Sequence, residues 1–173
     1  MRHRPERATH GGLENTPTSI TPPRRANGWV RQISPELGTV LLDTLGLAAT
    51  IEWHARRFQR CTGVVCELSV SHAADFELSE KFAATIFDIY NEALSNVARH
   101  AGASRVAIGL TLTPREVTMV VSDNGIGLPR EASTSDKGGL AVIRSRSQTY
   151  KGFCEVAGKR NAGTTVTVSL PIA

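Results

Sequence analysis

The longest amphipathic pattern in the chain lies between Ser79 and Gly102 and predicts a helix. Apolar residues recur there at steps of three and four, as they do on the buried side of a helix. Ser79 is a good N-cap and Gly102 is a typical residue just after a helix end. We expect one side of this helix to pack on the core through Phe82, Ile86, Ile89, Ala93 and Val97.

Two other helical patterns and five strand-like segments surround this helix. One helix begins near Ser34, is interrupted at Gly46 and continues over 47–58, and another spans 140–150. Strands are predicted over 64–70, 106–113, 116–123, 152–157 and 164–170, the last two as a hairpin. This order favours the α/β class, as a two-layer α/β sandwich with a mixed, mostly antiparallel sheet and helices on one face.

Charge divides the chain into a basic leader and a neutral remainder. The 173 residues carry a net charge of +4, and residues 1–31 hold six arginines against two glutamates, a surplus of four. The leader is also rich in Pro, Thr, Gly and Asn, so we predict that it is disordered. Its arginines lack regular spacing and Trp29 is its one aromatic residue, so we do not expect nucleic-acid binding.

Several other classes of protein are disfavoured by composition. With 40% hydrophobic and 21% charged residues, the chain has the composition of a globular protein. It has no apolar run near the roughly 20 residues of a membrane span and no secretory signal, so we expect a cytoplasmic protein. Its three cysteines form no CxxC motif and no cluster with zinc spacing.

Polar residues of the 79–102 helix form a candidate binding surface beside the apolar stripe. Helical spacing places Glu92, Asn96 and Arg99 close together on one face. A solvated face with a weak Glu–Arg pair is the simplest interpretation. However, asparagine is a poor helix former, and an amide oxygen inside a helix makes sense as a ligand of Mg²⁺.

Three further segments contain candidate ligand-binding residues. The strand 116–123 ends in Asp123 and continues as Asn-Gly-Ile-Gly, but Arg130 replaces the third glycine of a dinucleotide-binding motif. Residues 136–140, Asp-Lys-Gly-Gly-Leu, open a helix whose first N–H groups suit a phosphate. Residues 163–170 form an alternating, threonine-rich strand. Taken singly, these segments are typical of a turn, a helix entry and an ordinary strand.

Together and in this order, the four segments resemble the boxes of the GHKL ATPase fold. The closest likeness is to the ATP-binding domain of sensor histidine kinases that pair with LuxR-type response regulators. The N box resembles 91–101, the G1 box 123–127, the G2 region 139–146 and the closing box 163–166. The likeness covers residues 34–172.

The resemblance implies binding of ATP and Mg²⁺ and assigns roles to individual residues. Asp123 would accept a hydrogen bond from the adenine amino group, supported by Thr164, while Gly125 and Gly127 let the chain close over the base. Asn96 would coordinate Mg²⁺, and Glu92 would assist phosphoryl transfer. The phosphates would be approached by Arg99, His100, Lys137, Gly139 and Leu140, with Lys137 departing from the glycine that the family often has there.

The resemblance also divides the chain and leaves the phosphoacceptor unassigned. Residues 1–31 would be the leader, 32–60 a remnant of the dimerisation helix with a connecting helix, and 61–173 the ATP-binding catalytic domain. The acceptor histidine is not evident, and His54 is expected to be a packed surface residue. We therefore expect no autophosphorylation in cis. The expected partner is a response regulator or a kinase that carries the acceptor, and a homodimer remains open.

Two alternative functions remain open on the sequence. The first is a GHKL serine kinase of the anti-sigma type, which needs no internal histidine. The second is a non-catalytic nucleotide-binding adapter, which Lys137 and the truncated dimerisation helices favour.

Overall fold

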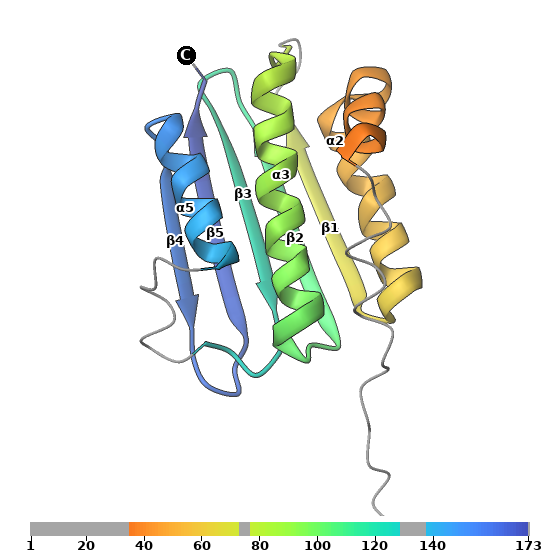
Figure 1. The fold of residues 1–173 in the computed structure, drawn as a ribbon, viewed down its shortest axis with the longest axis vertical. Helices are drawn as coiled ribbons and strands as arrows, with labels where there is room; N and C mark the ends of the chain where they lie inside the picture. Colours follow the sequence, from red (N-terminus) through yellow and green to blue (C-terminus); the bar gives the residue numbers. More distant parts are fainter. Residues whose placement is uncertain (1–34, 73–76, 129–137, 173) are drawn as a thin grey trace, which may run out of the picture.

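The computed structural model describes residues 35–72, 77–128 and 138–172 (Figure 1). The predicted leader 1–31 and Lys137 lie outside these ranges. The elements follow the predicted order, with boundaries shifted by one or two residues, except that the first helix continues to Thr62 instead of ending at 58. They are α2 (Pro35–Thr62), β1 (Val65–His72), α3 (Glu80–Asn96), the π-helical turn η1 (Val97–Ala101), β2 (Arg105–Leu112), β3 (Glu116–Asp123), α5 (Gly139–Thr149), β4 (Phe153–Gly158) and β5 (Thr164–Pro171).

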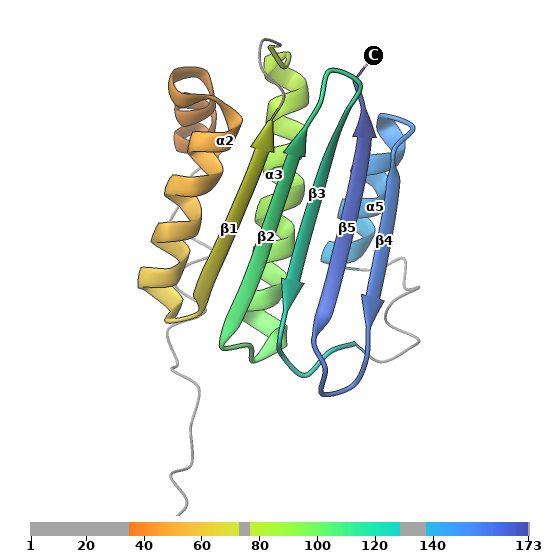
Figure 2. The same cartoon turned by 180° about the vertical axis from the view of Figure 1, so that it is seen from behind.

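The strands form one mixed sheet with helices on a single face. The strand order is β1-β2-β3-β5-β4, in which β1 pairs with β2 in parallel and every other neighbouring pair is antiparallel. Figure 1 shows α3 and α5 in front of the sheet and α2 beside β1 at its edge, and Figure 2, from behind, shows the bare sheet face. The predicted two-layer α/β sandwich is confirmed.

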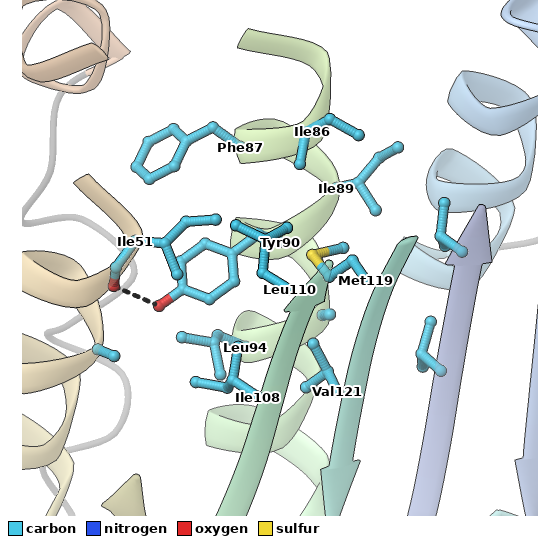
Figure 3. Packing of buried hydrophobic residues seen from close by; sticks show 14 of the residues in the cluster. Ile51, Ile86, Phe87, Ile89, Tyr90, Leu94, Ile108, Leu110, Met119 and Val121 are labelled. Atoms are coloured by element: carbon cyan, nitrogen blue, oxygen red, sulfur yellow. Dashed lines mark hydrogen bonds between the residues drawn. The ribbon is translucent and has the colours of Figure 1, made fainter. Parts of the chain in front are cut away.

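The core lies between this sheet and α3. Each predicted stripe residue of α3 is buried, and Ser79 caps the helix by accepting a hydrogen bond from the N–H of Phe82. Alternate residues of the central strands face the helix because side chains alternate across a strand. Figure 3 shows Ile108, Leu110, Met119 and Val121 from β2 and β3 packed beneath α3.

Gly46 divides α2 into two helical parts. Its backbone angles, φ 76° and ψ 170°, are non-helical and lie in a region that side-chain-bearing residues avoid. After this kink, Leu47, Ile51 and Phe58 are buried, whereas Val40 and Leu45 before it are exposed. The predicted interruption is confirmed, and it separates the packed part of α2 from a part with exposed apolar residues.

His54 is buried, and the prediction of a surface position was wrong. Its side chain is 1% exposed, between the rings of Phe87 and Tyr90 on α3 at 5.5 and 5.2 Å. His54 Nδ1 lies 3.3 Å from the Tyr90 hydroxyl, which donates to the Ile51 carbonyl at 3.4 Å (Figure 3). Burial, followed by the nearby Arg57 charge, lowers the His54 pKa to about 4. The error arose because helical periodicity identifies an apolar side but not the depth of what packs on it.

No helix in the described ranges is long and apolar enough to cross a membrane. Cys61, Cys66 and Cys154 are all free thiols and partly buried. Burial raises the pKa of Cys66 to about 11, so this thiol stays protonated at neutral pH.

Candidate functional site

A cavity of about 250 Å³ opens between the end of α3, the end of β3, the start of β5 and the start of α5. Seven of the residues predicted for the site line it: Asn96, His100, Asp123, Gly127, Gly139, Leu140 and Thr164. Residues that were not predicted complete its wall: Ala93, Val97, Ala101, Val121, Leu128, Gly138 and Val166. The wall therefore combines small and branched apolar side chains with a few polar groups.

Asp123 is the acidic group of this cavity and stands at the last position of β3. Partial burial raises its pKa, while the backbone N–H groups of Gly125 and Thr164 counteract the increase. The Gly125 N–H donates to Asp123 Oδ1 at 2.8 Å, which orients the carboxylate. A carboxylate held against an apolar wall can accept a hydrogen bond from an amino group on a flat heterocycle.

Glycines after Asp123 are required by close contacts within the chain. A side chain at Gly125 would collide with the Ala101 carbonyl oxygen, which accepts a hydrogen bond from the Ile126 N–H at 2.8 Å. Gly127 has φ 72°, and a side chain there would collide with the Lys159 carbonyl. Gly127 lines the cavity, whereas Gly125 lies behind the wall and shapes the loop.

Gly163 was missed as a site residue although it supports Asp123 directly. It is buried with φ 83°, and a side chain there would collide with the Asp123 carbonyl oxygen. Gly163 stands in the β4–β5 turn, and the sequence placed it in the hairpin and in the closing box 163–166 without giving it a role of its own. The pairing of β3 with β5 brings this turn beside Asp123.

Glu92 and Asn96 both face the start of α5. A Cβ atom at Gly139 would collide with Glu92 Oε1 and lie 2.8 Å from Asn96 Oδ1. Asn96 Nδ2 is buried and has no hydrogen-bond partner among the described residues. The predicted proximity of these two side chains is confirmed, and both converge on the backbone that opens α5.

The residues at this corner fit a Mg²⁺ ion with mostly non-protein ligands. Asn96 supplies a hard amide oxygen at the cavity wall, of the kind that Mg²⁺ accepts beside waters and phosphates. Within the described ranges, no group of three or more His, Cys, Asp and Glu residues could hold a metal ion. A cage built entirely from such side chains is therefore not present in these ranges.

The π-helical turn η1 places Arg99 and His100 differently with respect to the cavity. A regular helix would place Arg99 on the side of Glu92 and Asn96, but η1 widens the helix immediately after Asn96. Both basic side chains are exposed, and His100 lines the cavity whereas Arg99 does not. The predicted position of Arg99 rested on a constant helical period, which this turn violates.

A family model described as "Histidine kinase-, DNA gyrase B-, and HSP90-like ATPase" matches residues 83–173, which contain the described walls of the cavity. The chain belongs to this ATPase family, and the predicted resemblance is confirmed. Its described elements form the family's α/β sandwich.

Within the family, the sequence relatives are histidine kinases and sensor proteins. The signal transduction histidine-protein kinase/phosphatase DegS of Brevibacillus brevis is 31% identical over 144 residues, covering 83% of this chain and 37% of DegS. The nitrate/nitrite sensor protein NarX of Escherichia coli is 36% identical over 84 residues, covering 49% of this chain and 14% of NarX. The chain thus spans well under half the length of these relatives.

Solved structures show the same fold at lower identity. The histidine kinase domain of the blue-light activated kinase EL346 from Erythrobacter litoralis has a TM-score of 0.56 and 21% identity, covering 72% of this chain and 64% of that one. Full-length ShkA in complex with AMPPNP has a TM-score of 0.57 and 20% identity, covering 80% of this chain and 35% of ShkA.

Proposed function

We propose that this chain is the ATP-binding catalytic part of a two-component histidine kinase and transfers the γ-phosphate of ATP to a histidine on a partner. The observation that carries the proposal is the pairing of two features in one site. An acidic hydrogen-bond acceptor stands in an apolar cavity at Asp123, and Glu92 and Asn96 converge on Gly139 at its edge. The kinase activity named for DegS supports the same assignment.

Each part of the site has a distinct task in this proposal. Asp123 accepts a hydrogen bond from the adenine amino group, and a guanine carbonyl oxygen at that position would meet an acceptor instead of a donor. Asn96 holds Mg²⁺, which neutralises phosphate charge when it is bound. Glu92 orients the incoming acceptor group, since catalysis of phosphoryl transfer is largely positioning and charge neutralisation.

The γ-phosphate and its surroundings are assigned to the start of α5 and the residues before it. Gly139 and Leu140 provide backbone N–H groups at the helix entry, where anions bind. His100 approaches the nucleotide from the cavity wall, and Arg99 is assigned to the outer phosphates from its exposed position on η1. The proposal keeps the role of Lys137 at the phosphates. It also keeps the division of the chain into a leader (1–31), a helical remnant (32–60) and a catalytic domain (61–173).

The acceptor is proposed to belong to another protein. His54 is unsuitable because it is 1% exposed and contacts Tyr90 in the core. A kinase partner that carries a phosphoacceptor histidine, followed by a LuxR-type response regulator, completes the proposed phosphorelay.

Calorimetric titration tests nucleotide binding first. The chain is titrated with a non-hydrolysable ATP analogue, with and without Mg²⁺, beside the variants Asp123→Asn and Asn96→Ala. We expect Mg²⁺-dependent binding, a loss of at least tenfold in affinity for Asp123→Asn, and loss of the Mg²⁺ effect for Asn96→Ala. A folded wild-type chain that does not bind the analogue would refute the proposal.

Phosphotransfer to candidate partners tests the second half. The chain is incubated with labelled ATP and isolated dimerisation domains of histidine kinases. One half of the product is then treated with acid and the other half with alkali. Phosphohistidine is lost in acid, whereas phosphoserine survives, so an acid-stable product would identify the serine-kinase alternative. Nucleotide binding without any transfer would favour the adapter.

A further inference from the structure

A second hollow, of about 520 Å³, runs along the free edge of the sheet between α2 and β1. We call it the α2–β1 groove. It is separate from the site described above and shares no lining residue with it. Its wall consists of Glu52, Ala55, Arg56, Gln59 and Arg60 on α2 and Cys66, Leu68 and Val70 on β1.

The β1 side of the groove presents backbone groups that suit an additional strand. β1 is the first strand of the sheet order and pairs with β2 alone. The Val65 N–H donates toward β2, to the Ser104 carbonyl, whereas the next N–H, of Cys66, points to α2 and donates to Gln59 Oε1 at 2.8 Å. Alternation along the strand therefore turns the N–H groups of Leu68 and Val70 toward the groove. Neither has a hydrogen-bond partner on that side among the described residues.

Helix α2 lies beside this edge but does not cover its whole length. Both ribbon views show α2 at the outer edge of the sheet, next to β1 (Figures 1 and 2). Natural proteins usually cover an edge strand to prevent uncontrolled pairing. Here the Gln59 amide satisfies one edge N–H, and the remaining length of the edge faces a hollow. An added strand would lie about 5 Å from β1, with its helix-facing side chains against α2.

Charge and sterics select the occupant of the α2–β1 groove. Arg56 is paired with Glu52 at 2.6 Å, and Arg60 has no ion-pair partner in the described ranges, which leaves one positive charge in excess. The basic leader, with its surplus of four charges, does not complement the charge of this wall. A second copy is disfavoured as well, because antiparallel pairing of two β1 strands would bring both α2 helices into the same space.

We propose that the α2–β1 groove binds an extended, acidic segment of a partner protein, which joins the sheet at β1 as a sixth strand. Main-chain hydrogen bonds to Leu68 and Val70 provide the affinity, and Arg60 provides the preference for an acidic side chain. The occupant carries no helix of its own on that face, because α2 already fills the space.

A pair of synthetic peptides tests the proposal on the full chain. One blocked peptide alternates valine with glutamate over about seven residues, and its control replaces glutamate with lysine. Binding is followed by amide chemical shifts and hydrogen exchange. We expect the acidic peptide to shift the Leu68 and Val70 amides and slow their exchange at least tenfold, and the lysine peptide to leave both unchanged.

Three variants test which contacts carry the binding. Arg60→Glu should weaken the acidic peptide about five- to tenfold, while Arg115→Glu, an exposed arginine in the β2–β3 turn, should change nothing. Val70→Pro removes one edge N–H that the sheet itself does not use and should abolish binding, with the far-ultraviolet circular dichroism retained.

Several results would overturn the proposal. Equal binding of the two peptides would contradict the charge preference. If the acidic peptide perturbed only the amides of the bare sheet face, the peptide would bind outside the α2–β1 groove. Wild-type affinity in Val70→Pro would exclude strand addition. Protection of the Leu68 and Val70 amides that grows with protein concentration alone would identify a second copy as the occupant.

Discussion

Asp123 carries a charge into a cavity whose wall is largely apolar, and that position decides how the side chain behaves. Burial favours its neutral form, and two backbone N–H groups partly compensate. The charged form of this side chain therefore weakens the folded state, whereas the proposed function uses it as an acceptor for adenine. The proposed function and stability make opposite demands on this one carboxylate.

Replacing Asp123 by asparagine should separate these two demands. The pKa of Asp123 is higher in the folded than in the unfolded protein. The wild-type protein therefore loses stability as pH rises from the unfolded pKa through the folded pKa of this side chain. The substituted amide is neutral at every pH and keeps an oxygen for the Gly125 N–H. We expect the Asp123→Asn variant to unfold in urea at the same or a higher concentration than wild type at pH 7, despite its weaker nucleotide binding. A variant less stable by about 1 kcal/mol or more would contradict this reasoning.

Two glycine substitutions should have different consequences although both introduce a single methyl group. At Gly139 the methyl meets the flexible end of Glu92 and the Asn96 amide, so both side chains must move. We expect Gly139→Ala to lower stability by less than about 1 kcal/mol, since alanine also favours the helix, but to reduce the Mg²⁺ dependence of nucleotide affinity about tenfold. Calorimetry with and without Mg²⁺ measures this effect.

At Gly125 the added methyl meets the backbone carbonyl of Ala101, which cannot rotate away while it accepts the Ile126 hydrogen bond. We expect Gly125→Ala to lower the free energy of unfolding by about 2–4 kcal/mol. Urea denaturation of both variants, monitored by circular dichroism, provides the comparison. Equal stabilities in the two variants would show that the G1 loop relaxes more easily than its contacts indicate.

Helix α2 and helix α3 are joined by a polar contact inside an otherwise apolar interface. His54 and Tyr90 share it, and Phe87 packs beside both rings. Tyr90 lies two residues before Glu92 along α3, so the contact links α2 to the helix that carries the candidate site. A neutral imidazole suits this interface, and a charged one does not.

The His54 imidazole should make stability depend on pH between about 4 and 6.5. Its folded pKa is about 4 and its ordinary value is 6.5, so the unfolded chain binds the proton more readily in that window. The contribution of neutral His54 to stability is therefore fully present above pH 6.5 and is lost as pH decreases toward about 4. We expect a loss of about 2–3 kcal/mol between pH 7 and pH 4.5.

Two variants isolate this contribution. His54→Gln cannot titrate and should lose this part of the pH dependence, with the remaining carboxylates still contributing theirs. Tyr90→Phe should lower stability by about 1 kcal/mol at every pH while keeping the slope. Identical urea midpoints against pH in wild type and His54→Gln would place the titration elsewhere.

In the molecule as a whole, nucleotide binding links the site to global unfolding. A ligand that binds the folded state alone at 100 times its dissociation constant stabilises it by about 2.7 kcal/mol. For a domain of this size that corresponds to a rise in Tm of about 5–10 °C. We expect this rise with the Mg²⁺-ATP analogue in wild type and at most about half of it in Asp123→Asn at the same concentration, measured by differential scanning fluorimetry. A shift of equal size in both would mean that the analogue binds elsewhere.

Local patterns predicted the elements and the order in which they occur, because periodicity and capping act within a few residues. They also placed Asp123 at a strand end and Glu92 with Asn96 on one helix side. What they missed depends on contacts between distant segments. Gly163 reaches Asp123 only through the β3–β5 pairing, and His54 is buried only because α2 packs on α3. Arg99 was placed beside Glu92 and Asn96 but does not line the cavity, because the π-helical turn before it leaves no periodic signal in so short a segment.

That turn also bears on how the chain tolerates insertion and deletion. A π-helical turn holds one residue more than the α-helical turn it replaces. Removing one residue from 97–101 would therefore restore a regular α-helical turn at the end of α3 and leave the later residues close to their present direction around the helix axis. Adding one more residue would instead rotate every later residue by about 100°. The Ala101 carbonyl would then turn away from the Ile126 N–H, and His100 would leave the cavity wall. An insertion in this segment is therefore more damaging than a deletion of the same length.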